Sequence, residues 1–426
     1  MKRVLVLGGG GREHAIVRAL LRSPQRPEVL AAPGNVGIAR DKIPCLPVQA
    51  DDVDGVVRTA RDEGIDLVVV GPEAPLVAGV VDALAEAGIA AFGPTAPAAR
   101  IEGSKAYAKQ LMRDVGVPTA SYMVLKSREE AEAQLPCASY PAVLKADVLA
   151  AGKGVIICQS EAEAREAVDA FFGERRFGET EVVLEEFLEG EELSLLALCD
   201  GERAVPMAPA QDYKRIFDDD QGPNTGGMGS YSPVPGIDRD HARALALAVH
   251  QPVVDEMRRR GTPYHGVLYA GLMMTAGGPK VLEYNCRFGD PETQAILPRL
   301  RSDLLDLLER STRPGGLEGV EIEWSSQWAV TVVLASRGYP ASSSKGEVIS
   351  GLRSIDSIHT ELLHAGTAEQ DGELVTAGGR VLNVTGMGET PSAARASAYA
   401  AADLIAFDGK QLRRDIAARA VERGEG

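Results

Sequence analysis

Residues 1–14 read MKRVLVLGGGGREH, and this stretch predicts a buried strand that leads into a glycine turn and then a helix. Val4 to Leu7 is a continuous apolar run, which is typical of a strand buried on both faces. Gly8 to Gly11 follow at once, and a helical pattern extends from Glu13 to Arg22. Glycines let backbone N–H groups approach a ligand closely, and the start of a helix favours a negative group. The stretch therefore predicts a phosphate-binding turn, and a turn that only tightens helix–strand packing is the alternative.

Short apolar runs continue to alternate with helical patterns up to about residue 93, and this alternation predicts a parallel sheet with helices on both faces. The expected strands are 28–31, 67–70 and 89–93, and the expected helices are 51–63 and 78–87. Two turns follow these strands, PGNVG at 33–37 and GPEAPL at 71–76. Ligands of such sheets gather at the carboxyl ends of the strands, although either turn could be only a connection.

The chain has 426 residues, more than one hydrophobic core usually serves, so we expect a multidomain protein of α/β and α+β class. The GPTAP cluster at 93–97 marks the first boundary, and short strands with turns predominate from Trp328 onward. The expected domains are an N-terminal parallel α/β domain at 1–100, a core formed by 101–122 and 191–325, a small α+β lid at 123–190, and a C-terminal β-rich α+β domain at 326–426.

The composition is that of a globular protein, with 45% hydrophobic and 25% charged residues. A formal net charge of -16 without any basic run argues against nucleic-acid binding, because neutralising phosphates requires clustered Lys and Arg. The first apolar run is too short for a signal peptide, and no window is long enough to span a membrane. The five cysteines are widely spaced and contain no CxxC pair. We therefore expect a cytoplasmic protein with no membrane or nucleic-acid partner. We also expect a monomer.

The most informative polar pattern is LEYNCR at 282–287. The alternation of side chains along a strand puts Glu283, Asn285 and Arg287 on one face. Mg²⁺ takes a few protein oxygens and completes its octahedron with nucleotide phosphates, so a carboxylate and an amide beside an arginine suit a triphosphate site. An amphipathic strand with a solvated polar face is the alternative for this motif alone.

Two further motifs supply partners for a triphosphate. Lys145 ends an apolar strand, and AAGKGV at 150–155 adds a flexible loop with backbone donors and a second lysine. A lysine in an apolar strand usually meets an anion, although its ammonium can instead extend to the surface. In EEFLEGEE at 185–192, carboxylates could accept hydrogen bonds from ribose and exposed backbone could bind an adenine edge. A solvated acidic turn is the alternative there.

The segment GPNTGGMG at 222–229 is too rich in glycine for a plain connection, and it predicts backbone wrapped around a ligand. A mobile surface loop is the alternative. Asp218 to Asp220 precede it and could bind a metal, but a solvated acidic turn is favoured. No local Ser/His/Asp or Cys/His grouping indicates a protein nucleophile.

Together these motifs resemble the ATP-grasp superfamily and, within it, the phosphoribosylamine–glycine ligases. The resemblance covers nearly the whole chain and is carried by GGGGREHA, PGNVG, GPEAPLVAG, GSKAYAK, LKADVLAAGKGV, EEFLEGEELS, QDYKRIFDDDQGPNTGGMGSYSP and LEYNCRFGDPETQ, in this order. It implies an N-terminal pre-ATP-grasp domain, an ATP-grasp core with a small lid, and a C-terminal α+β domain. It also implies that ATP and Mg²⁺ or Mn²⁺ are used to join glycine to 5-phosphoribosylamine through a glycyl phosphate, in purine biosynthesis.

The resemblance also implies roles for individual residues. The residues expected to bind ATP are Lys105, Lys145, Gly152, Lys153, Gly154, Glu185, Glu186, Phe187, Leu188 and Glu192. The expected metal ligands are Glu283 and Asn285, and the expected catalytic residues are Arg287 and Lys145. The residues expected to hold the other substrates are Gly9, Gly10, Gly11, Asn35, Gly37, Glu73, Asp212, Pro223, Asn224, Thr225, Gly226 and Gly227.

Three positions depart from the family pattern: Val148 and Asp219 stand where glycine is usual, and Tyr213 stands where histidine is usual. The nearest competing function is an ATP-grasp enzyme that acts on another carboxylate, and the GPNTGGMG segment argues against it. A nicotinamide-dependent oxidoreductase would need an acidic residue at the end of the second strand, where the sequence reads VLAAP. A binding protein without catalysis would be expected to lack the Lys145, Glu283 and Asn285 set.

Overall fold

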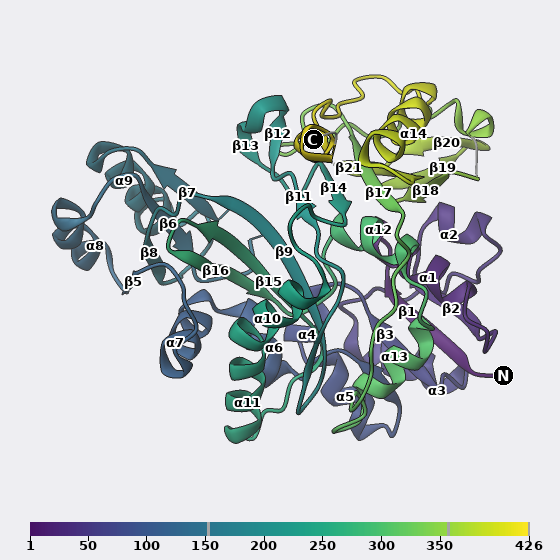
Figure 1. Ribbon diagram of the computed structural model, residues 1–426, viewed down its shortest axis with the longest axis horizontal. Helices are drawn as coiled ribbons and strands as arrows, with labels where there is room; N and C mark the ends of the chain where they lie inside the picture. Colours follow the sequence, from purple (N-terminus) through teal and green to yellow (C-terminus); the bar gives the residue numbers. More distant parts are fainter. Residues whose placement is uncertain (151–153, 356–357, 425–426) are drawn as a thin grey trace.

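The computed structural model describes residues 1–150, 154–355 and 358–424. Figure 1 shows a large body that holds both chain termini and a smaller lobe at the left, which contains α8 (Arg128–Gln134) and α9 (Glu161–Val168). The expected combination of α/β and α+β domains is confirmed. Among the described residues, no helix combines the length and the apolar character that crossing a membrane requires.

The N-terminal part is a parallel sheet in the order β2-β1-β3-β4, as the alternating pattern predicted. Its strands are β1 (Arg3–Gly8), β2 (Glu28–Pro33), β3 (Leu67–Val70) and β4 (Ala90–Phe92), and its helices are α1 (Gly11–Leu21), α2 (Val36–Arg40), α3 (Val53–Asp62), α4 (Glu73–Val77) and α5 (Val80–Glu86). Parallel pairing sets Gly8 opposite Pro33 and Leu7 opposite Val70. The turns after β1, β2 and β3 therefore meet at the carboxyl edge of the sheet.

An antiparallel sheet in the order β10-β9-β15-β16 forms the middle of the body. Its strands are β9 (Glu191–Asp200), β10 (Ala204–Pro206), β15 (His265–Thr275) and β16 (Gly278–Asn285). The helices beside it are α6 (Ala96–Gly103), α7 (Lys105–Val115), α10 (Arg239–Val249) and α11 (Gln251–Arg259). Because α6 and α7 directly follow β4, they connect this sheet to the N-terminal one.

The lobe contains a separate antiparallel sheet in the order β5-β8-β6-β7. Its strands are β5 (Tyr122–Leu125), β6 (Ala142–Ala146), β7 (Val155–Cys158) and β8 (Val182–Glu186). Side chains such as Leu144, Phe171 and Leu184 form a hydrophobic core of its own. A unit with its own core can move as a rigid piece relative to the body.

The last sheet, in the order β11-β14-β17-β21-β18, combines strands that are far apart in the sequence. β11 (Gln211–Asp212) and β14 (Gly229–Ser232) flank the GPNTGGMG segment, and they pair with a sheet formed by β17 (Trp328–Ala335), β21 (Arg380–Gly388) and β18 (Thr360–His364). The remaining elements are β12 (Arg215–Phe217), β13 (Gln221–Asn224), α12 (Glu292–Ile296), α13 (Leu304–Ser311), β19 (Thr367–Gln370), β20 (Glu373–Thr376), α14 (Pro391–Leu404) and α15 (Ala418–Gly424). The glycine-rich segment is therefore built into the C-terminal sheet.

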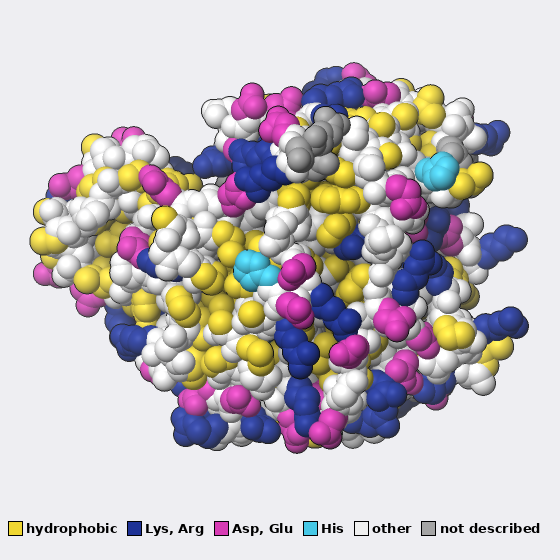
Figure 2. Space-filling model, in the orientation of Figure 1, with side chains coloured by type: hydrophobic (Ala, Val, Ile, Leu, Met, Phe, Trp, Pro, Cys, Tyr) yellow, Lys and Arg dark blue, Asp and Glu magenta, His cyan; other side chains and the backbone are white. Residues whose placement is uncertain are grey.

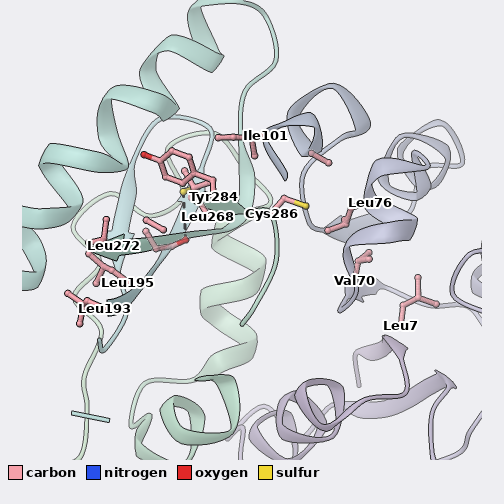
Figure 3. Packing of buried hydrophobic residues seen from close by; sticks show 14 of the residues in the cluster. Leu7, Val70, Leu76, Ile101, Leu193, Leu195, Leu268, Leu272, Tyr284 and Cys286 are labelled. Carbon is pink, nitrogen blue, oxygen red and sulfur yellow. Dashed lines mark hydrogen bonds between the residues drawn. The ribbon is translucent and has the colours of Figure 1, made fainter. Parts of the chain in front are cut away.

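One hydrophobic core joins the N-terminal sheet to the central sheet. Figure 3 shows Leu7, Val70 and Leu76 on one side and Leu195, Leu268 and Tyr284 on the other, with Cys286 between them. Each fully buried leucine of this kind contributes about 1.5–3 kcal/mol. The core thus holds the glycine turn after β1 in a stable position relative to the end of β16.

His250 is fully buried where α10 meets α11, and its Nε2 lies 3.2 Å from the carbonyl oxygen of Leu195. Burial lowers the pKa of His250 to about 4. The unfolded chain takes up a proton near its ordinary pKa of about 6.5, whereas the folded chain does not. Stability is therefore lost as the pH falls from about 6.5 towards 4, by about 3 kcal/mol for a shift of this size.

We expect His250→Gln to reduce the loss of unfolding free energy between pH 7 and pH 4.5, measured by urea denaturation. His241 is exposed, so His241→Gln is the matched control and should leave the pH dependence unchanged. An equal slope in His250→Gln and the parent protein would show that His250 does not contribute to acid sensitivity.

Candidate active site

Glu283 and Asn285 lie at the end of β16, with Lys105, Lys145, Lys214 and Arg287 close enough to act on Glu283 electrostatically. Burial disfavours the charged form of Glu283, but these cations outweigh it and keep the pKa of Glu283 below its usual value. The three lysines come from α7, from β6 in the lobe, and from the connection between β11 and β12, and Arg287 directly follows β16. A carboxylate surrounded by such cations matches a site for a metal ion and an anionic nucleotide.

Arg287 connects this strand end to the N-terminal domain. Its Nε lies 3.3 Å from Glu73 Oε2, and its Nη2 lies 3.4 Å from Glu102 Oε1 and 3.4 Å from Asn285 Oδ1. Burial opposes ionisation of Glu73, but Arg287 and Arg12 lower the pKa of that carboxyl to about 2. Arg287 is thereby held in place by carboxylates on two sides.

Glu185 is buried at the end of β8, and its side chain faces lysines. Its Oε2 lies 2.9 Å from Lys109 Nζ and 3.1 Å from Lys145 Nζ. Burial lowers the pKa of Lys109 to about 8, even though Glu185 opposes this shift. Lys109 is not among the site residues predicted from the sequence, although Lys105 and Lys109 are four residues apart and hence share one face of α7.

The other residues expected to bind ATP lie around the lobe junction. Lys105 Nζ donates to the carbonyl oxygens of Ala146 and Val148, at 3.0 and 2.9 Å. Glu186 Oε1 accepts from Lys280 Nζ at 2.7 Å, and Glu192 Oε2 lies 2.7 Å from Lys214 Nζ.

Of the other residues in this group, Phe187 is 37% exposed, Leu188 is buried, and the carbonyl of Gly154 accepts from the Ala146 N–H. Gly152 and Lys153 lie outside the described residues.

The glycines of the turns after β1 and β2 approach other parts of the chain closely. A Cβ on Gly9 would lie 2.4 Å from the Gly34 carbonyl oxygen, and a Cβ on Gly37 would lie 2.4 Å from His364 Cγ. Asn35 Nδ2 donates to the carbonyl oxygens of Gly9 and His364, at 2.9 Å each. Asn35 therefore links the turn after β2 to the turn after β1, and His364 of the C-terminal domain packs against the turn after β2.

Gly10 and Gly11 sit at the start of α1. The Gly10 N–H donates to Glu13 Oε2 at 2.6 Å, which explains why a glutamate occupies the third glycine position of a dinucleotide fingerprint. A Cβ on Gly11 would lie 2.3 Å from Asn383 Nδ2 and 2.9 Å from Gln294 Nε2. Asn383 and Gln294 are fully buried, and neither is predictable from the sequence, because they approach the turn only in the folded chain.

The glycine-rich segment, GPNTGGMG at 222–229, is held by its own hydrogen bonds and by close contact with Pro291. Thr225 Oγ1 donates to the Lys214 carbonyl at 2.8 Å and accepts from the Gly227 N–H at 2.9 Å. Gly227 has a φ of +106°, and a Cβ there would lie 2.3 Å from Pro291 Cδ, so glycine is required. Pro223 and Asn224 belong to β13, where Asn224 pairs with Arg215.

A buried acidic group adjoins this segment. Burial raises the pKa of Asp212, against the opposing charge of Lys214. Glu292 Oε1 accepts from Ser194 Oγ at 3.0 Å and from Tyr269 OH at 2.9 Å. Glu292 is not among the site residues predicted from the sequence.

Two of the positions that depart from the family pattern face the C-terminal segment. Tyr213 OH accepts from the Ala417 N–H at 2.9 Å, and the guanidinium of Arg413 lies 4.7 Å from the centre of its ring. Asp219 has a φ of 56°, and its N–H donates to Asp415 Oδ2 at 3.0 Å. Tyr213 thus fastens the hairpin β12–β13 to the C-terminal domain.

The parallel N-terminal sheet, the central antiparallel sheet with its lobe, and the cations gathered around Glu283 are together typical of an ATP-grasp enzyme. The Phosphoribosylglycinamide synthetase models match along the chain, the N domain at residues 2–102, the ATP-grasp (A) domain at 103–293 and the C domain at 329–419. The chain belongs to this family, the phosphoribosylamine–glycine ligases, whose members are ATP-dependent carboxylate–amine ligases.

Individual relatives agree over the full length. The phosphoribosylamine–glycine ligase of Ralstonia nicotianae is 47% identical over 99% of this chain and 100% of its own, and that of Streptomyces coelicolor is 49% identical over 98% and 99%. The crystal structure of the Thermotoga maritima enzyme superposes with a TM-score of 0.84, at 38% identity over 97% of this chain and 100% of its own. The biotin carboxylase domain of Hydrogenobacter thermophilus 2-oxoglutarate carboxylase shares the fold alone, with a TM-score of 0.74 at 18% identity over 96% of this chain and 91% of its own.

Proposed function

We propose that this chain joins glycine to 5-phosphoribosylamine at the expense of ATP, giving glycinamide ribonucleotide, ADP and phosphate in purine biosynthesis. The observation that carries this proposal is the convergence of Glu283, the surrounding lysines and Arg287, which pairs with Glu73 of the N-terminal domain. The names of the relatives support the choice of substrates.

In the proposed reaction, a carboxylate oxygen of glycine attacks the γ-phosphorus of ATP, and ADP leaves. The amine nitrogen of phosphoribosylamine then attacks the carbonyl carbon of the glycyl phosphate, loses a proton and displaces phosphate. Lys105 and Lys145 neutralise phosphate charge, and Arg287 acts near the transferred phosphoryl group. Such transfer depends on positioning and charge neutralisation, so no protein nucleophile is required.

The fold uses ATP with a divalent metal, and we propose Mg²⁺ or Mn²⁺ held by Glu283 and Asn285. Carboxylate and amide oxygens are the ligands that these hard cations prefer. Since Mg²⁺ is usually bound through one or two protein oxygens together with substrate phosphates, the nucleotide would complete the ligand set. The metal would offset negative charge on the transferred group.

We propose that the remaining residues divide between the two ends of the site. Adenine would lie at Glu185–Leu188 and ribose at Glu192, with Gly152–Gly154 over the phosphates. The phosphoribosylamine would lie at Gly9–Gly11, Asn35 and Gly37, and the loop of Pro223–Gly227 with Glu73 and Asp212 would line the space between. Both Glu73 and Asp212 are partly buried, and the side chain of Glu73 is 29% exposed, which supports a place for both in the wall of a site that substrates can reach.

We propose the domain roles that the sequence predicted, namely substrate binding by 1–100, ATP-grasp chemistry by 101–122 with 191–325, a lid at 123–190, and a C-terminal domain at 326–426. The separate core of the lobe supports the lid. Closure would exclude water, which hydrolyses acyl phosphates.

We further propose that the protein acts as a monomer in the cytoplasm, on small molecules and not on nucleic acid or membranes. The five cysteines are free, and on the face shown in Figure 2 basic and acidic side chains are interspersed. Free thiols fit a reducing compartment, and interspersed charge offers no basic stripe to phosphate polymers on that face.

The test is ADP release by the purified protein with Mg²⁺-ATP, freshly generated phosphoribosylamine and glycine, leaving out one component at a time. ADP formation that requires both glycine and the amine, with glycinamide ribonucleotide detected by mass, is the expected result. Turnover with another carboxylate would show that glycine is not the substrate, and no turnover in any combination would refute the proposal.

The proposed lid is tested in the same preparation by amide hydrogen exchange. Exchange at Val155–Cys158 should slow when Mg²⁺-ATP is bound, and an exchange rate that does not change with nucleotide would count against the lid.

A further inference from the structure

Arg380 begins β21 in the C-terminal sheet, yet its guanidinium contacts two segments of the ATP-grasp part. Its Nη1 donates to the carbonyl oxygens of Gly226 and Asp290, at 2.6 and 2.9 Å. Its Nη2 lies 3.0 Å from Asp290 Oδ2, in an ion pair whose side chains are 22% and 14% exposed. Because the partly buried guanidinium of Arg380 binds three acceptor atoms, it fixes the position of Gly226 relative to Asp290.

The peptide of Gly226 is held by the C-terminal domain at both ends. While Arg380 binds its carbonyl, the Gly226 N–H donates to Tyr339 OH at 2.9 Å. A Cβ on Gly379 would lie 2.4 Å from Tyr339 Cδ2, so the tyrosine ring packs directly on the residue before Arg380. Arg380 and Tyr339 thus form one clamp on the glycine-rich segment.

Asp290 connects the clamp formed by Arg380 and Tyr339 to the glycine turn. Its Oδ1 accepts from Gln294 Nε2 at 2.6 Å, and its Oδ2 would lie 3.7 Å from a Cβ on Gly10. With Arg380 in place, the negative charge of Asp290 is compensated beside the start of α1. Without Arg380, Asp290 would lose its ion pair and keep the electrostatic influence of Arg12, so more negative charge would face the turn where an anionic phosphate is expected to bind.

We propose that Arg380 is a positioning residue for the phosphoribosylamine. It holds the Gly226 peptide and the Asp290 carboxylate in the arrangement that accepts this substrate, and it does not act on ATP. The inference rests on the proposed function, since it assigns a determinant of amine-substrate binding within that same site. It also gives the C-terminal domain a direct part in substrate recognition.

The test compares steady-state kinetics of Arg380→Ala with those of the parent enzyme and of Arg337→Ala. Arg337 is a matched control because it lies in the same domain and pairs with Asp408 at 2.6 Å with 62% and 67% of the two side chains exposed. We expect the KM for phosphoribosylamine to rise roughly 10- to 100-fold in Arg380→Ala, as for loss of hydrogen bonds to a charged group, while the KM for ATP changes less than about twofold. Arg337→Ala should change neither constant.

Two conservative variants keep the proposal testable if Arg380→Ala fails to fold. Arg380→Lys retains the charge but cannot reach all three acceptors, so its KM for phosphoribosylamine should lie between those of the parent enzyme and Arg380→Ala. Tyr339→Phe removes only the hydroxyl, so its KM for phosphoribosylamine should rise less than that of Arg380→Ala. If the parent enzyme forms glycinamide ribonucleotide but these variants keep the parental KM for phosphoribosylamine, or raise the KM for ATP equally, the positioning role is wrong. If the parent enzyme forms no product, the proposed function itself fails.

Discussion

Glu283→Gln is expected to lower ligase turnover by about a thousandfold or more. Glutamine has nearly the same shape, so the substitution removes charge without leaving a cavity. It takes away the proposed anionic metal ligand, and it leaves Lys105, Lys145 and Lys214 without the carboxylate that lies among them. Because the Glu283 charge is proposed to act on the phosphoryl group during its transfer, its loss should change kcat more than the KM for glycine or for phosphoribosylamine.

The measurement is kcat as a function of free Mg²⁺ at saturating ATP, glycine and phosphoribosylamine. Glu321→Gln makes the same chemical change at a side chain that is 68% exposed and pairs with Arg239 at 2.9 Å, and it should behave as the parent. A Glu283→Gln enzyme with unchanged Mg²⁺ dependence and turnover would exclude Glu283 as a metal ligand.

Arg287→Lys is expected to lower kcat by about a hundredfold or more while the protein stays folded. The arginine fork reaches Glu73, Glu102 and Asn285 at 3.3 to 3.4 Å, and a lysine ammonium keeps the charge but cannot keep all three contacts. The proposed role near the transferred phosphoryl depends on that fixed orientation. Arg287→Ala would also remove the cation beside Glu102, whose side chain is 9% exposed, and it should lower the unfolding free energy by about 1–3 kcal/mol.

These effects are separated by measuring kcat, the KM for ATP and urea denaturation on the same variants. Arg313 is exposed, so Arg313→Lys is the control and should change none of them. If Arg287→Lys loses activity only in proportion to a loss of folded protein, Arg287 is structural. Full activity in Arg287→Lys would contradict a need for the guanidinium.

The sequence by itself determined the features that depend on local spacing. The apolar run at Val4–Leu7 followed by glycines predicts a buried parallel strand with its turn, because side-chain period and glycine conformations are properties of neighbouring residues. In the same way, the alternation of 282–287 set Glu283 and Asn285 on one side of β16. The joint order of the motifs was enough to identify the family, since it does not depend on any single contact.

Only the tertiary structure decided which distant residues complete the site. Glu185 faces Lys109 and Lys145, Tyr213 faces Ala417, and Arg380 reaches Asp290 across 90 residues of sequence. Nothing in the period of a strand or helix specifies such partners, because they depend on how separately formed sheets pack. The C-terminal sheet takes β11 and β14 from the middle of the chain, and this long-range pairing is what brings the C-terminal domain to the glycine-rich segment.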